Sequence, residues 1–131
     1  MIVSVPPVDD DSPILVVDDD AVLRRALSRI LRSEGHRVIE AGDGDAALEA
    51  AREHSSSLVV LDYSMPGMDG ETVLHAMRKE HAESTPPALL LTASGLQQER
   101  AEAMGAAVGL CKPFRVQDLL DAVRRHRRSD A

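Results

Sequence analysis

The sequence predicts an α/β fold in which five parallel strands form one sheet flanked by five helices. Two observations lead to this prediction. Five short apolar runs alternate with five stretches of helical hydrophobic spacing, and most of the apolar runs are continuous. Strict alternation is typical of a parallel sheet with helices on both faces, and strands covered on both faces read as continuous hydrophobic runs. Because crossovers between parallel strands are right-handed, all carboxyl ends of the strands should share one edge.

The expected strands are short, as is usual in small sheets. They are ILVV at 14–17, RVIEA at 37–41, LVVL at 58–61, ALLL at 88–91 and AVGLC at 107–111. Aromatic residues make up only 2% of the chain, so the core around these strands must come from aliphatic side chains and methionine.

The stretches between the expected strands carry apolar residues at helical spacing. We expect helices over 21–34, 44–54, 69–81 and 96–105, and a last one from Val116 onward. The first stretch ends at Gly35 and the fourth at Gly105, and glycine is common just after a helix because it tolerates the left-handed conformation. The last stretch repeats its apolar residues at i, i+3, i+4 and i+7, which gives one apolar face.

Length, charge and composition limit the classes of protein to consider. With 131 residues and 44% hydrophobic side chains, the chain suits one domain over 13–128, with a flexible leader over 1–12 and a tail over 129–131. The formal net charge of −7 argues against a surface that tracks nucleic-acid phosphates. We find no signal-peptide pattern and no apolar stretch that could span a bilayer, and the single cysteine, Cys111, fits a reducing compartment. We therefore expect a cytoplasmic protein that binds neither nucleic acid nor membrane.

Polar side chains follow four of the five expected strands, at the edge where their carboxyl ends meet. They belong to Asp18, Asp19, Asp20, Asp62, Thr92 and Lys112. The second strand, which ends in Ala41-Gly42, adds none. Ligands of open parallel sheets bind at this edge. Asp20 stands directly before the first helix, where we expect it to be the N-cap.

Neighbouring carboxylates repel one another unless a cation lies among them. Carboxylate oxygens and waters are the ligands that Mg²⁺ prefers, and Lys112 would offset further charge. Metal ion, carboxylate, hydroxyl and ammonium together suit phosphoryl transfer, in which a carboxylate can be the nucleophile and form an aspartyl phosphate. The metal ion and Lys112 would neutralise phosphoryl oxygens, and Thr92 would donate a hydrogen bond to another.

Four motifs, ILVVDDD, LVVLDYSMPGMDG, LLLTAS and CKPF, occur in this order with helix-length spacers. Together they resemble the receiver domain of two-component response regulators, of the chemotaxis-regulator kind, over residues 14 to about 126. The resemblance implies a flavodoxin-like sheet of strand order 2-1-3-4-5. It also implies that Asp62 is the phosphoacceptor, that Asp19 binds Mg²⁺ directly and that Asp18 binds it through water.

The resemblance extends to further residues and to partners. It implies that the backbone carbonyl of Ser64 completes the metal ligands, that Lys112 and Thr92 contact the phosphoryl group, and that Lys112–Pro113 is a cis peptide. A sensor histidine kinase or a phosphotransfer protein would donate the phosphoryl group to Asp62. The chain would then act on an unknown downstream protein as a signalling receiver and not as an enzyme.

One position departs from the pattern of the family. Its members usually carry an aromatic residue three positions before the lysine, whereas this chain has Gly109, and its only tyrosine is Tyr63. An aromatic switch at position 109 is therefore impossible. We expect the fourth helix, the fifth strand and the fifth helix to form the surface that changes on phosphorylation. The reason is that Ala93-Ser94-Gly95, directly after Thr92, is a loop of small residues.

Two other functions fit parts of the sequence. VVDDDAVL matches the D-x-D-x-[TV]-[LV] motif of haloacid-dehalogenase-like phosphatases, with Asp18 as nucleophile and Asp20 as general acid. Thr92 and Lys112 would support the phosphate, but Asp62 would have no role. A phosphorylation-independent interaction domain is the other alternative. A P-loop NTPase is excluded because no G-x-x-x-x-G-K-[ST] segment is present, and the five histidines lack metal-ligand spacing, so we expect them at the surface.

Overall fold

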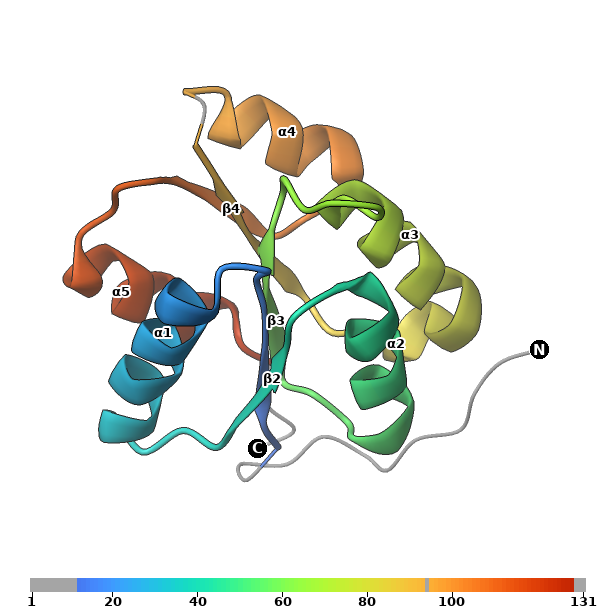
Figure 1. The fold of residues 1–131 in the computed structure, drawn as a ribbon, viewed down its shortest axis with the longest axis horizontal. Coiled ribbons are helices and arrows are strands. Elements are labelled where there is room, and N and C mark those ends of the chain that lie inside the picture. Colours follow the sequence, from blue (N-terminus) through green and yellow to red (C-terminus); the bar gives the residue numbers. More distant parts are fainter. Residues whose placement is uncertain (1–11, 94, 129–131) are drawn as a thin grey trace.

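The computed structural model describes residues 12–93 and 95–128, which form a five-stranded parallel sheet with helices on both faces (Figure 1). The strands are β1 (Ile14–Val17), β2 (Val38–Ala41), β3 (Leu58–Asp62), β4 (Ala88–Thr92) and β5 (Val108–Cys111). The helices are α1 (Ala21–Ser33), α2 (Gly44–Glu53), α3 (Gly70–His81), α4 (Gln97–Met104) and α5 (Val116–His126), with a 3₁₀ turn η1 (Ala82–Ser84) after α3. The order β2-β1-β3-β4-β5 confirms the expected fold. Ser94, the tail over 129–131 and the expected leader up to residue 11 lie outside the described residues.

The carboxyl ends of the strands meet at one edge of the sheet because the strands are parallel and their last residues are paired or lie within one residue of a pair. Val17, the last residue of β1, is paired with Leu61 of β3, and Asp62 ends β3 one residue further on. Thr92 ends β4 opposite Cys111, the last residue of β5. Residues that end or follow these strands are therefore brought close together.

Alternate strand residues face two separate apolar layers. Ile14 and Val16 of β1 pack with the apolar faces of α1 and α5, whereas Leu15 and Val17 pack with α2, α3 and α4. In Figure 1, α1 and α5 accordingly lie on one side of the sheet, and α2 and α3 lie on the other. The central strands β1, β3 and β4 are buried throughout, but the edge strands β2 and β5 are mostly half-buried. Coverage on both faces, as the apolar runs predicted, thus holds for the three central strands.

Aspartates begin three of the helices. Asp20, Asp43 and Asp69 are the N-caps of α1, α2 and α3, and each accepts at least one hydrogen bond from a backbone N–H group of the first turn. The predicted capping role of Asp20 is confirmed. Helix α4 differs, because its N-cap position is Leu96, which offers no side-chain acceptor. Its C-cap is Gly105, which has the left-handed conformation that the sequence predicted.

Several expected element bounds differ from the structure by one residue, and one expected exposure was wrong. Strands β3 and β4 continue by one residue, through Asp62 and Thr92, because both residues still pair across the sheet. His81 was expected at the surface but is only 2% exposed, because it continues the buried face of α3. Among the helices of the described ranges, none combines the length and the apolar character needed to cross a bilayer.

Candidate functional site

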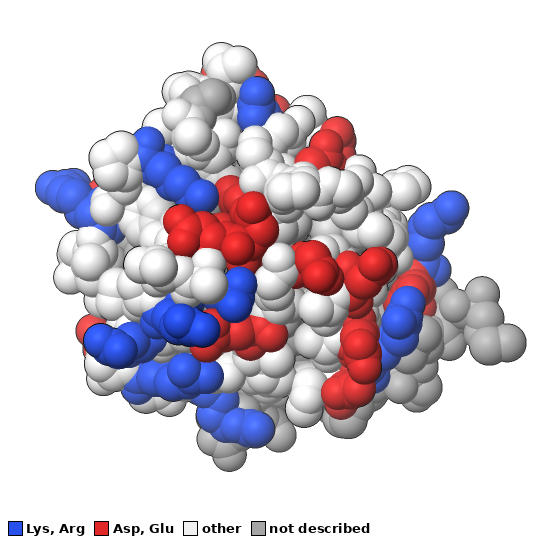
Figure 2. Space-filling model, in the orientation of Figure 1, with Lys and Arg blue, Asp and Glu red and all other residues white. Residues whose placement is uncertain are grey.

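Three carboxylates gather at the carboxyl edge of the sheet. Asp18 and Asp19 follow β1 and Asp62 ends β3, and one oxygen from each lies within 4.8 Å of the others. Asp18 and Asp62 are buried, whereas Asp19 is exposed. Figure 2 shows acidic side chains gathered near the middle of the face that looks onto this edge. The three residues thus meet, as their strand-end positions predicted.

Lys112 follows β5 and contacts the cluster of Asp18, Asp19 and Asp62, which we call the acidic group. Its Nζ donates to Asp62 Oδ1 at 3.0 Å and to Asp18 Oδ2 at 3.4 Å. Burial alone would lower the pKa of Lys112, but the hydrogen bond to Asp62 and the charges of Asp62 and Asp18 outweigh burial and raise it. Lys112 therefore stays cationic and offsets part of the negative charge. The Lys112–Pro113 peptide bond is cis, as the resemblance implied.

The other predicted site residues lie at the same edge in different surroundings. Thr92 is 2% exposed, and its carbonyl accepts a hydrogen bond from the backbone N–H of Lys112 at 2.8 Å. Ser64 lies two residues after Asp62 and is exposed. Asp20 accepts two hydrogen bonds from backbone N–H groups of the first turn of α1. Its carboxylate therefore caps a helix and does not join the acidic group.

Asp18 is held at four polar atoms. Its N–H donates to the carbonyl of Ala41 at 3.2 Å, its Oδ1 accepts from the N–H of Asp20 at 3.0 Å, and its Oδ2 accepts from Lys112. Its carbonyl oxygen accepts a hydrogen bond from Arg24 Nη1 at 2.8 Å. Arg24 was not predicted from the sequence. The prediction that the second strand adds nothing to the site was wrong, because this strand supplies the Ala41 carbonyl.

Gly70, the first residue of α3, lies very close to the backbone at the end of β3. Its N–H donates to the carbonyl of Tyr63 at 2.8 Å. A Cβ at position 70 would lie 2.6 Å from the carbonyl oxygen of Asp62, which is closer than real Cβ atoms come. Any larger residue would displace the backbone that carries Asp62. This role of Gly70 was not predicted from the sequence either, because the close approach depends on a tertiary distance.

The surroundings of Asp62 disfavour its ionised form. Burial raises the pKa of Asp62 above its ordinary value near 3.8, and the charges of Asp18 and Asp19 add to this rise, while Lys112 opposes it. The folded protein therefore holds this proton to a higher pH than the unfolded chain does. The ionised carboxylate costs stability above the raised pKa, and this cost disappears as the pH falls through it.

In the metal-free protein we expect the Asp62 carboxyl to titrate at a pH above 3.8. Magnesium should move this midpoint down, because a bound cation favours the ionised form. Carbon-13 NMR of the aspartate carboxyl groups, with and without magnesium, measures both midpoints, and Asp62→Asn identifies the resonance by its loss. A metal-free midpoint at or below 3.8 would contradict the effect of burial.

The donors of the acidic group match the requirements of Mg²⁺. This ion prefers hard oxygen ligands, keeps several waters and is commonly held by one or two carboxylates. Asp18, Asp19 and Asp62 offer only carboxylate oxygens, and the exposure of Asp19 leaves one side of the group open to solvent. The residues present therefore fit a magnesium ion.

Comparison with known proteins gives a match over most of the chain. The profile of the response regulator receiver domain matches residues 14–124. The chain belongs to this family. It is 43% identical over 115 residues to the response regulator protein FleR of Pseudomonas aeruginosa, a match that covers 86% of this receiver. The receiver spans only 24% of the length of FleR.

Solved structures are similar to this receiver over nearly its whole fold. The chemotaxis protein CheY4 of Vibrio cholerae is 31% identical with a TM-score of 0.79, and the match covers 88% of this chain and 98% of CheY4. The receiver domain of the sensor histidine kinase PA1611 from Pseudomonas aeruginosa is 29% identical with a TM-score of 0.78, and the match covers 88% and 96% of the two chains. That structure has a magnesium ion coordinated in the active site cleft.

Membership of the family makes this chain a signalling module, and not an enzyme that turns over a separate substrate. Asp18, Asp19 and Asp62 form the acidic triad that is typical of the magnesium site of receivers. The expected family, the acidic site and the magnesium cofactor are therefore confirmed. In the phosphatase alternative Asp20 would be the general acid, but one of its carboxylate oxygens is engaged in capping α1.

Proposed function

We propose that this receiver takes a phosphoryl group from a phosphohistidine onto the carboxylate of Asp62. The position of Asp62 carries the proposal. This residue is buried at the end of β3, within 4.8 Å of oxygens of Asp18 and Asp19 and 3.0 Å from the ammonium of Lys112. Asp18, by contrast, has both carboxylate oxygens in hydrogen bonds to protein groups.

The reaction moves a phosphoryl group from nitrogen to oxygen. A carboxylate oxygen of Asp62 attacks phosphorus, the P–N bond to the donor imidazole breaks, and its electron pair stays on the ring nitrogen. In this proposal Lys112 contacts one phosphoryl oxygen and Thr92 another. Bound Mg²⁺ would neutralise charge on the phosphoryl oxygens.

The ligand roles are also part of the proposal. We assign Asp19 and Asp62 as direct ligands, Asp18 as a ligand through water, and the backbone carbonyl of Ser64 as the last protein ligand. The exposure of Asp19 supports its direct role, and the existing hydrogen bonds of Asp18 support an indirect one.

Peptide mapping tests which aspartate is modified. Trypsin cuts after Arg24, Arg52 and Arg78, so Asp18 and Asp62 fall on different peptides. After incubation with Mg²⁺ and a small phosphodonor, borohydride reduction marks the acyl phosphate, and we expect the mark on the peptide that contains Asp62. A mark on the peptide of Asp18 would instead support the phosphatase mechanism.

The proposed partners are a sensor histidine kinase or a phosphotransfer protein as donor, and a downstream protein as target. A histidine kinase partner follows from membership of the family, whereas the choice between donors belongs to the proposal. Because the single Cys111 fits a reducing compartment, a cytoplasmic location suits this function.

We further infer that a shift of α4 against β5 changes the surface formed by α4, β5 and α5. Gly109 supports this inference. A Cβ at position 109 would lie 2.4 Å from the carbonyl oxygen of Gln97 and 3.3 Å from the Cβ of Ala101. Helix α4 thus occupies the space that an aromatic side chain at 109 would need, so the moving part is proposed to be the helix.

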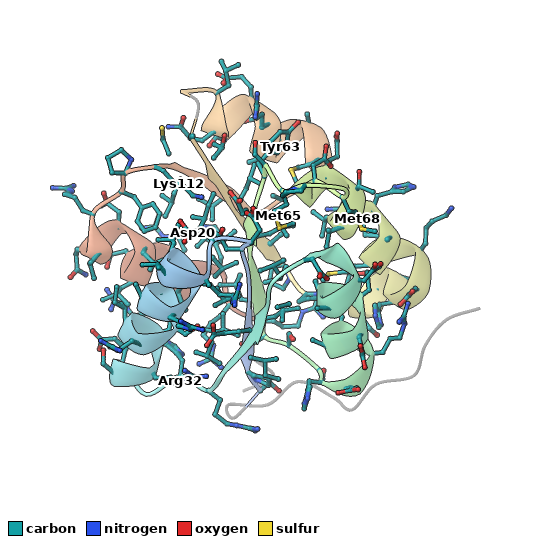
Figure 3. The ribbon with its side chains drawn as sticks, in the orientation of Figure 1. Asp20, Arg32, Tyr63, Met65, Met68 and Lys112 are labelled. Atoms are coloured by element: carbon teal, nitrogen blue, oxygen red, sulfur yellow. The ribbon has the colours of Figure 1, made fainter. Side chains whose placement is uncertain are left out.

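The two ends of α4 are held by different contacts. At its C-terminal end, Arg78 of α3 donates to the carbonyls of Met104 and Gly105 at 2.6 and 2.8 Å. Nearer its start, the guanidinium of Arg100 lies 4.2 Å from the centre of the Tyr63 ring, which is a cation–π contact. Tyr63 directly follows the phosphoacceptor, and Figure 3 shows it between the site and α4. The start of α4 is therefore joined to the site by this contact.

Removing the Tyr63 ring should loosen the first half of α4. Cation–π contacts at exposed sites contribute about 0.5–1 kcal/mol, so Tyr63→Leu should speed amide exchange there about 2- to 5-fold. Tyr63→Phe, which keeps the ring, is the matched control and should exchange as the wild type does. Hydrogen exchange measured by NMR tests this, with α2 as internal reference. Equal exchange in the two variants would contradict the coupling.

A further inference from the structure

Arg24, in the first turn of α1, connects the loop that carries Asp18 to strand β2. Its Nη1 donates to the carbonyl of Asp18 at 2.8 Å, and its Nε donates to Glu40 Oε1 at 3.2 Å. The side chain of Arg24 is only 18% exposed. Because two separate elements engage its guanidinium, this group is fixed in one position beside the metal site.

The room for this guanidinium depends on Gly42. A Cβ at position 42 would lie 3.1 Å from Arg24 Nη1, so the guanidinium would have to move by a few tenths of an ångström. The φ of Gly42 lies outside the left-handed region, so the backbone itself accepts a side chain at this position. Gly42 is therefore needed to leave room for the guanidinium of Arg24, and not to allow a left-handed backbone conformation.

We propose that Arg24 is a positioning residue for the magnesium site, with Glu40 and Gly42 keeping its guanidinium in place. The inference rests on the proposed function of the site. By holding the carbonyl of Asp18, Arg24 fixes the peptide from which the carboxylates of Asp18 and Asp19 extend. Groups that orient metal ligands without binding the ion typically change metal affinity about 10- to 100-fold when they are lost.

Charge and position predict opposite effects of removing Arg24. A cation near a magnesium site repels the ion, so loss of the charge alone should strengthen Mg²⁺ binding. Loss of a fixed Asp18 peptide should weaken it. If a variant without Arg24 binds Mg²⁺ more weakly than the wild type, the result therefore indicates a positioning role and not an effect of charge.

The test is a titration of the nitrogen-15-labelled chain with MgCl₂, followed by the amide shifts of the site loops. We expect Arg24→Met to weaken Mg²⁺ binding about 10-fold, because Arg24 holds a ligand through its backbone. Gly42→Ala keeps every charged residue and should weaken binding about 2- to 5-fold through a small displacement of Arg24. Arg32→Met is the control, because Arg32 also lies near Glu40, at 3.8 Å, and its loss should change affinity less than about 2-fold.

The double variant Arg24→Met/Gly42→Ala shows whether the two residues act together. It should bind Mg²⁺ no more weakly than Arg24→Met alone, because no guanidinium remains to be displaced. If the losses of Mg²⁺ binding free energy in the two single variants add up in the double variant, the proposed role of Gly42 is overturned. Binding by Arg24→Met at or above the wild-type affinity would overturn the positioning role, and if this variant does not fold, Gly42→Ala decides in the same way. A wild-type chain without magnesium-dependent shifts would overturn the proposed function and this inference with it.

Discussion

Replacing Asp62 with asparagine should abolish phosphorylation of this receiver. The side chain keeps its size, and its amide oxygen can still accept the hydrogen bond that Lys112 donates at 3.0 Å. The amide oxygen, however, is too weak a nucleophile to attack phosphorus. After incubation with Mg²⁺ and a small phosphodonor, a phosphate-affinity gel should show a retarded band for the wild type and none for Asp62→Asn.

Asp69→Asn supplies the matched control for this experiment. It makes the same chemical change seven residues further on, where the side chain caps α3. Asparagine caps helices as well as aspartate does, so this variant should be retarded as the wild type is. Equal retardation of Asp62→Asn and the wild type would contradict the assignment of the phosphoacceptor.

Lys112→Met should have opposite effects on phosphorylation and on metal binding. Without the ammonium, the attacking and phosphoryl oxygens lose a fixed positive charge, and we expect the phosphorylation rate to fall about 100-fold. The three carboxylates also lose their compensating cation, so the metal-free protein should lose about 1–3 kcal/mol of unfolding free energy. Magnesium should restore most of this stability and bind more tightly than in the wild type, because it replaces the missing charge.

Urea unfolding in EDTA and in MgCl₂, together with the phosphorylation rate, measures these effects. The chain has only one other lysine, Lys79, which is exposed on α3, and Lys79→Met is therefore the control. Lys79→Met should leave the rate and the magnesium dependence of stability unchanged. A loss of stability by Lys112→Met that is the same with and without magnesium would show that the lysine does not compensate the acidic group.

The strand ends, and with them the acidic group, could be predicted from the sequence because their signals are local. An apolar run such as ILVV marks a buried strand by itself, and parallel direction then brings Asp18 and Asp62 to one edge. His81 shows that one local signal was overlooked. It lies four residues after Met77 and seven after Leu74, on the buried face of α3, and this spacing predicts burial.

The contacts that hold the site could not be predicted in this way. Arg24 bonds to a backbone carbonyl, and such a contact leaves no mark in the pattern of charged and apolar residues. The roles of Gly42 and Gly70 depend on the 3.1 and 2.6 Å that would separate an added Cβ from groups on other elements. Such distances are set by the packed fold, so sequence spacing alone does not reveal them.

Tyr63 is the only tyrosine of the chain, which contains no tryptophan. Nearly all ultraviolet emission of the molecule therefore originates from one ring, which stands next to the phosphoacceptor and under the guanidinium of Arg100. We expect a new charge beside this ring, or loss of its contact with Arg100, to change the intensity of its fluorescence. The fluorescence of the unlabelled protein should therefore report binding and release of ligands at the site as they occur.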